Sequence, residues 1–145
     1  MKKINSILII SFHFTNLMLI TFYLYPGSIF GYILHNNLYS DPTITRNFLI
    51  SSNHFYIFIL LSTIGILAYH NTNKINFLIN YLFFLSIILE LLHLFVPYRS
   101  FELKDLFGNI IGVLVIVVFY KIKKIYEKNN KYFFISIDFI YCGLL

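Results

Sequence analysis

Charged residues are scarce in this sequence: they make up 12% of its 145 residues, whereas hydrophobic residues make up 59%. A water-soluble domain needs roughly a quarter of its residues charged to cover its surface. The composition therefore excludes an ordinary soluble domain and predicts a protein whose side chains mostly face lipid. Tryptophan is absent as well, so anchoring at the membrane interface has to come from tyrosine.

Cysteine occurs once, at Cys142, which excludes an internal disulfide and a cysteine-based metal site. The net charge is +5, and its basic residues gather at the two ends of the chain. Lys2 and Lys3 come first, and after the last long apolar run follow Lys121, Lys123, Lys124, Lys128 and Lys131. Beside apolar runs such clusters set topology or contact anionic lipid headgroups, so no nucleic-acid partner is expected.

Four apolar stretches approach or exceed the roughly 20 residues that a helix needs to cross a bilayer. They cover residues 4–25, 48–69, 75–96 and 105–122. In hydrocarbon every backbone N–H and C=O must be satisfied within its own segment, so helices are expected despite the many Ile, Phe and Val residues. The predicted fold is all-α: a polytopic membrane protein with a bundle of four transmembrane helices.

The first span and the connection that follows it carry further sequence signals. Residues 4–25 begin like a secretory signal peptide, but the run is long and no small-x-small cleavage site follows, so we predict a retained helix. Residues 26–47 are rich in turn formers and are expected to carry a short re-entrant or interfacial piece.

The C-terminal region is apolar over residues 132–145 but is short for a span and contains Asp138. A short interfacial helix or tail is therefore favoured over a fifth transmembrane helix. The expected division is a four-helix domain over residues 1–125 and a tail, basic and then apolar, over residues 126–145.

Lysine and arginine in the connections indicate the orientation. Four crossings place both termini on one side. That side, with the turn at residues 70–75, carries eight of these residues against three on the other side. We expect both termini in the cytoplasm.

One stretch, residues 89–112, is unusually polar for such a chain. Glu90 and His93 are three residues apart and share a helix face, and Asp105 and Asn109 share a face of the next helix. Arg99 lies in the turn between the two helices. A carboxylate at the depth of Glu90 costs about 2.5–3.5 kcal/mol if it is ionised near the bilayer centre, so it must be paired, hydrated or protonated.

The first two spans supply further candidates. His54 lies near the expected start of the second span, at a depth comparable with that of Glu90. His13 lies near the middle of the first span and could face the same cavity from below, but a hydrogen-bonded contact between helices is favoured over a ligand role for it. Gly108 and Gly112 form a small-xxx-small pair, a pattern that lets another helix approach closely. His35 and His70 are expected to be solvated loop residues.

The stretch "ELLHLFVPYRSFELKDLFGNIIG" resembles the signature of VanZ-like membrane proteins. Glu90, Arg99, Asp105, Asn109 and Gly112 stand at the spacings of that signature. His93 replaces the usual Gln, and of the usual Asp-Lys-x-x-His that opens the second helix the chain keeps only His54. The resemblance implies a bacterial cytoplasmic membrane protein, in a family with some members linked to resistance against glycopeptides such as teicoplanin.

These residues together predict a site that binds an anionic lipid or a lipid-linked envelope precursor in the outer leaflet. Its expected members are His54, Glu90, His93, Arg99, Asp105 and Asn109, with Arg99 holding a phosphate or carboxylate. No cofactor is expected. Glu90-x-x-His93 has the spacing of carboxylate-bridged metal bundles, but those sites use two such motifs and the chain has one, so no metal site is predicted.

Three other functions fit the same residues. The polar groups could simply hold helices together, at about 0.6 kcal/mol for each contact. An intramembrane enzyme could use Glu90 or Asp105 as general base with His54 or His93 as proton shuttle, although no nucleophile is identifiable. A transporter would require a homo-oligomer, because four helices are few for a monomeric carrier.

Overall fold

The computed structural model describes residues 2–38 and 50–142, and within these ranges all regular structure is helical. The helices are α1 (Lys2–Leu24), α2 (Ile29–His35), α3 (Ser52–Tyr69), α4 (Ile75–Leu92) and α5 (Leu103–Cys142). All except α2 are long and apolar enough to cross a membrane. The prediction of an all-α bundle with four transmembrane helices is confirmed.

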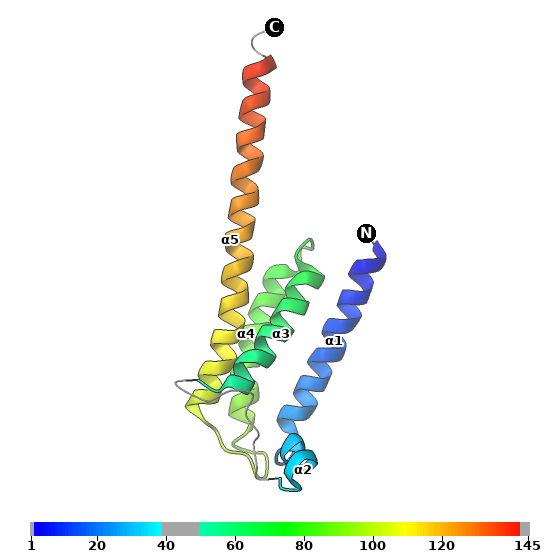
Figure 1. Cartoon of the computed structure of the whole chain (residues 1–145), viewed down its shortest axis with the longest axis vertical. Helices are drawn as coiled ribbons and strands as arrows, with labels where there is room; N and C mark the ends of the chain where they lie inside the picture. The colour runs from blue at the N-terminus through cyan, green and yellow to red at the C-terminus, as the bar shows by residue number, and fades with distance from the viewer. Residues whose placement is uncertain (1, 39–49, 143–145) are drawn as a thin grey trace.

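Helix α3 is the centre of the bundle, since it contacts α1, α4 and α5. Helix α1 begins, and α5 ends, on the same side of the bundle (Figure 1). Helix α2 and the connection between α4 and α5 lie at the opposite end (Figure 1). The polar stretch of the sequence, residues 89–112, is therefore at the end of the bundle away from the termini.

Local sequence signals explain how α1 ends and α2 forms. Pro26 and Gly27 follow α1, and Gly27 has a positive φ of 81°, which glycine adopts without strain. The Ser28 hydroxyl then caps α2 by accepting a hydrogen bond from the Gly31 N–H, and Asn36 ends it in the left-handed conformation. Helix α2 lies within residues 26–47, where a short re-entrant or interfacial piece was expected; residues 39–49 lie outside the described part.

Helix α4 ends four residues earlier than predicted, at Leu92 instead of residue 96. The next N–H groups bond three residues back, from His93 to Glu90 and from Phe95 to Leu92, as in a 3₁₀ turn. Pro97 explains the early end, because a proline disfavours helical backbone in the residue before it.

Helix α5 has 40 residues and continues far beyond residue 122, where its span was expected to end. Neither proline nor glycine occurs between Val113 and Cys142, and Lys and Glu, which favour helix, fill the basic segment. The region after residue 125 was expected to be a short interfacial helix or tail. In the structure it is helical as far as Cys142 and continues α5, while residues 143–145 lie outside the described part.

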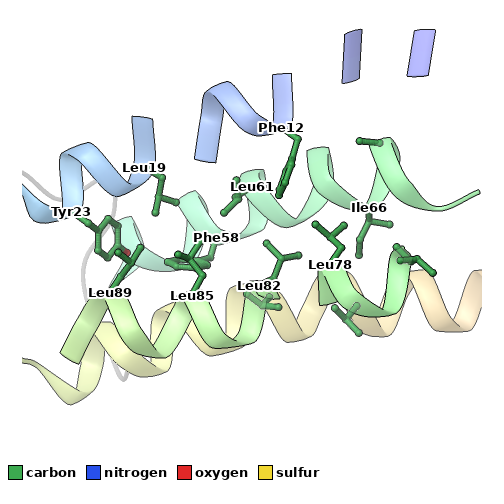
Figure 2. Close-up of a cluster of buried hydrophobic side chains, with 14 residues drawn as sticks. Phe12, Leu19, Tyr23, Phe58, Leu61, Ile66, Leu78, Leu82, Leu85 and Leu89 are labelled. Carbon is green, nitrogen blue, oxygen red and sulfur yellow. The ribbon is translucent and has the colours of Figure 1, made fainter. Parts of the chain in front are cut away.

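The centre of the bundle is filled by apolar side chains from all four long helices (Figure 2). Phe58 and Leu61 of α3, Leu82 of α4 and Val113 of α5 are wholly buried. Large apolar side chains also cover the outside of the bundle, for example Phe77 and Phe119. An apolar outer surface is expected of helices that face lipid.

Two glycines lie where α5 meets α3. A Cβ atom at Gly108 would be 2.8 Å from the Ser51 carbonyl oxygen, and one at Gly112 would be 2.7 Å from the Phe55 carbonyl oxygen. Both distances are too short for a carbon atom against backbone. These two positions let the backbones of α3 and α5 approach closely, which is the packing described for small-xxx-small pairs.

We predict that Gly112→Ala lowers the stability of the purified protein by about 1–3 kcal/mol, because the added methyl group pushes α5 away from α3. The melting temperature in detergent is the measurement. Val118→Ile adds one carbon to the same helix at a position that is 44% exposed, and should leave that temperature unchanged. Equal melting temperatures for Gly112→Ala and the wild type would contradict the close contact.

Candidate functional site

Polar side chains from four helices meet at the end of the bundle away from the termini. We call this set the polar cluster; its members are Tyr23 of α1, His54 of α3, Glu90 of α4, His93 directly after α4, and Asp105 and Asn109 of α5. Five of the six residues predicted for the site are thus brought together. The sixth, Arg99, lies in the connection between α4 and α5.

His54 is in the middle of the cluster. Its Nδ1 lies 2.9 Å from the Tyr23 hydroxyl and 3.2 Å from Asn109 Oδ1. Its other ring nitrogen, Nε2, is 3.3 Å from Asp105 Oδ2. The imidazole therefore bridges a neutral hydrogen-bonding group on one side and a carboxylate on the other.

Asn109 is wholly buried, and its amide is held in one orientation. Its Nδ2 donates to the Ser86 carbonyl oxygen at 3.2 Å. Because a backbone carbonyl can only accept, the amide oxygen must be the atom that faces His54 and Tyr23. The Tyr23 hydroxyl donates to this oxygen at 2.7 Å.

Glu90 is wholly buried, although a carboxylate is costly at such a position. Its Oε1 accepts a hydrogen bond from the Glu102 backbone N–H at 3.0 Å and lies 3.4 Å from His93 Nδ1. His93 Nε2 donates to the Tyr23 carbonyl oxygen at 3.0 Å. The proton of a neutral His93 ring is used in this bond at Nε2. A hydrogen bond between Nδ1 and Oε1 therefore needs a second proton, carried either by the ring or by the carboxyl group.

The cluster changes from buried to partly exposed across its width. The side chains of Glu90 and His93 are 0% and 3% exposed, whereas those of His54 and Asp105 are 15% and 19% exposed. Arg99, in the connection between α4 and α5, is partly buried. A ligand that enters from the exposed side would therefore meet His54 and Asp105 before Glu90 and His93.

Tyr23 is the member that the sequence did not single out. Its hydroxyl bonds His54 and Asn109, its carbonyl accepts from His93, and its ring stacks on His93 with centroids 5.5 Å apart. A polar aromatic residue two residues before "YPG", near the end of a mostly apolar helix, is a signal that could have found it. Counting residues along the first span places Tyr23 near the end of that span, at a depth in the membrane similar to that of His54.

His13, which could have faced the site from below, does not reach it. Its Nε2 lies 3.1 Å from the Tyr69 hydroxyl, at the other end of α3. Ten residues of helix separate His13 from Tyr23, a distance of about 15 Å along the axis. His13 is thus a hydrogen-bonded residue at the contact of α1 with α3, the role that was favoured for it over that of a ligand.

Chemically, the cluster offers two carboxylates, two imidazoles, an amide and a phenol. Such a set can bind a polar or ionic ligand, move a proton between the carboxylates and imidazoles, or hold a cation. Three residues, His54, Glu90 and Asp105, each place one ligand-type atom within 4.8 Å of the other two.

In a comparison with protein families, the family model described as VanZ/LLP1 matches residues 3–124. The matched region contains the four long apolar segments and every member of the polar cluster. No curated protein and no solved structure matches the chain.

We predict that Asn109→Leu destabilises the protein by about 1–3 kcal/mol. The substitution keeps the branched shape of the side chain but leaves the buried Tyr23 hydroxyl and the Ser86 carbonyl without this partner. The melting temperature in detergent measures the loss, and Asn80→Leu, on the exposed face of α4, is the matched control. If both variants melt at the wild-type temperature, the buried hydrogen bonds of Asn109 do not contribute to stability.

Proposed function

The chain belongs to the VanZ/LLP1 family, and from this premise we propose that it is a bacterial cytoplasmic membrane protein whose polar cluster binds the phosphate of an anionic lipid. The lipid is a phospholipid or a lipid-linked envelope precursor. Through that binding the protein would affect susceptibility to glycopeptides such as teicoplanin.

The orientation that we propose puts the polar cluster at the outer surface of the membrane. The five lysines of residues 121–131 and the two at the start of the chain lie on the side of the bundle where α1 begins (Figure 1). Lysine and arginine in short flanking segments favour the cytoplasmic side. The opposite end, with the cluster, then lies at the level of the outer headgroups.

The observation that carries the proposal is the combination of a wholly buried Glu90 with the partly exposed ionic pair of His54 and Asp105, at the end of the bundle where the connection with Arg99 lies. If the cluster served only to join helices, apolar side chains of similar volume would do so at least as well, because ions are costly to desolvate. Ionisable residues inside membrane spans usually mark a binding or transport site.

Each edge residue has a definite role in this proposal. The planar guanidinium of Arg99 suits two phosphate oxygens at once. Asp105 and Glu90 carry the opposite charge, so they orient the cationic groups around the ligand and are not themselves phosphate contacts. Tyr23 and Asn109 hold the His54 ring in place through its Nδ1.

We predict that Arg99→Lys weakens lipid binding about tenfold, a loss of about 1.4 kcal/mol, because lysine lacks the planar two-pronged donor. Native mass spectrometry of the purified chain, titrated with undecaprenyl phosphate or phosphatidylglycerol, measures the affinity. Phosphatidylcholine serves as the zwitterionic comparison.

The matched control is Lys104→Gln, which removes one positive charge from the same end of the bundle at an exposed position. It should bind like the wild type and melt at the same temperature. Equal affinity of wild type and Arg99→Lys for both anionic lipids would contradict a phosphate site. In a susceptible host, wild type but not Arg99→Lys should reduce teicoplanin sensitivity.

The orientation gives a prediction of its own. In a Cys142→Ser background, Ser100→Cys in the connection between α4 and α5 should react with a membrane-impermeant maleimide added to intact cells. Asn71→Cys, in the turn at the opposite end, should react only after the cells are opened. Both positions are exposed, so a reversed labelling pattern would place the cluster on the cytoplasmic side.

A further inference from the structure

Three side chains of the polar cluster are spaced like the ligands of one metal ion. His54, Glu90 and Asp105 come from α3, α4 and α5, and their ligand atoms lie within 4.8 Å of one another. The distance from His54 Nε2 to Asp105 Oδ2 is 3.3 Å. Two ligands about 2.1 Å from a tetrahedral ion are about 3.4 Å apart, so this pair already has the separation that an ion requires.

The hydrogen bonds of His54 leave its Nε2 available as a ligand. Its Nδ1 faces Asn109 Oδ1, which can only accept, and the Tyr23 hydroxyl, whose own proton goes to Asn109. Nδ1 therefore carries the ring proton of a neutral His54, and the lone pair is on Nε2, pointing at a carboxylate. Metal-binding histidines are typically oriented by a donated bond from the other ring nitrogen.

Glu90 supplies a second, independent observation. It is wholly buried, and its Oε1 is occupied by the Glu102 N–H and by His93. Its Oε2 has no hydrogen-bond partner among the described residues and lies 3.8 Å from His54 Nδ1, on the inner side of the cluster. Burying a carboxylate oxygen without a hydrogen-bond donor costs free energy. A cation between Glu90, Asp105 and His54 would offset this desolvation cost.

We propose that His54, Glu90 and Asp105 bind one divalent transition-metal ion, with Zn²⁺ as the best match. One imidazole and two carboxylates are ligands that Zn²⁺ accepts, and imidazole disfavours Mg²⁺ and Ca²⁺. The ligand atoms lie as far as 4.8 Å apart, against about 3.4 Å in a tetrahedral shell, so Asp105 and Glu90 complete the shell by moving toward the ion. Three protein ligands leave a coordination position open toward the partly exposed edge of the cluster.

Spacing along the sequence does not predict this set. The Glu90-x-x-His93 motif pairs Glu90 with the wrong histidine, because His93 is turned to the Tyr23 carbonyl. The ion site shares residues with the proposed lipid site but does not rest on lipid binding.

The test uses the full chain, purified in detergent without phospholipid, stripped with EDTA and titrated with ZnCl₂ by isothermal calorimetry. We expect one Zn²⁺ per chain and a rise in melting temperature on binding. His54→Gln and Asp105→Asn should each weaken binding by tenfold or more. His70→Gln removes an exposed histidine at the other end of the bundle and should bind like the wild type.

Two results would overturn the site: absence of stoichiometric Zn²⁺ binding by the stripped wild type, or unchanged affinity in both His54→Gln and Asp105→Asn. Size-exclusion chromatography checks that each variant is folded. If His54→Gln misfolds, Asp105→Asn still tests the site, because Asp105 is partly exposed. Zinc binding is measured without phospholipid, so the two sites are tested separately. A wild type that binds anionic lipid but no zinc refutes the ion site alone. A wild type that binds zinc but no anionic lipid refutes the lipid site alone.

Discussion

The wholly buried carboxylate of Glu90 constrains the whole end of the bundle that contains the polar cluster. An ionisable group in such a position has to be surrounded by donors or positive charge, and these come here from separate parts of the chain. His93 and the Glu102 N–H approach one oxygen, and His54 lies near the other. The connection between α4 and α5 must therefore fold back over Glu90, which also brings Asp105 close to it.

The close approach of α3 and α5 is the second condition for the cluster. Gly108 and Gly112 flank Asn109 on α5 and lie against the α3 backbone from Ser51 to Phe55. Bulkier residues at the two positions would move Asn109 and Asp105 away from His54. The packing of small residues and the geometry of the polar groups are thus parts of one arrangement: the glycines set the distance across which the hydrogen bonds form.

A phosphate site and a cation site in the same cluster are chemically compatible. With the proton shared by Glu90 and His93, that pair is neutral, and Asp105 and Arg99 cancel one another. A divalent ion would make the cluster positive, and its open coordination position would face the same partly exposed edge as Arg99. The two proposals still rest on different observations: the ionic edge in one case, and the orientation of His54 with the unpartnered Glu90 oxygen in the other.

The sequence by itself determined the class of protein, the four spans and most of the residues in the cluster. It could do so because the hydrophobic effect acts on composition and run length, and because carboxylates are so costly in lipid that each one is conspicuous. The spacing of Glu90, Arg99, Asp105, Asn109 and Gly112 was sufficient to indicate the family. Helix ends were less accurate, since α4 stops before Pro97 and α5 continues through its lysines.

Only the tertiary structure decided which helix faces present these residues to one another. Tyr23 joins the cluster and His13 does not, because the rotation and depth of α1 are set by its packing on α3 and not by its own sequence pattern. The partnership of His54 with Asp105, and of His93 with the Tyr23 carbonyl, likewise depends on contacts between residues more than 50 positions apart in the chain. An apolar helix has no polar face to fix its rotation in lipid, so neighbouring helices fix it instead.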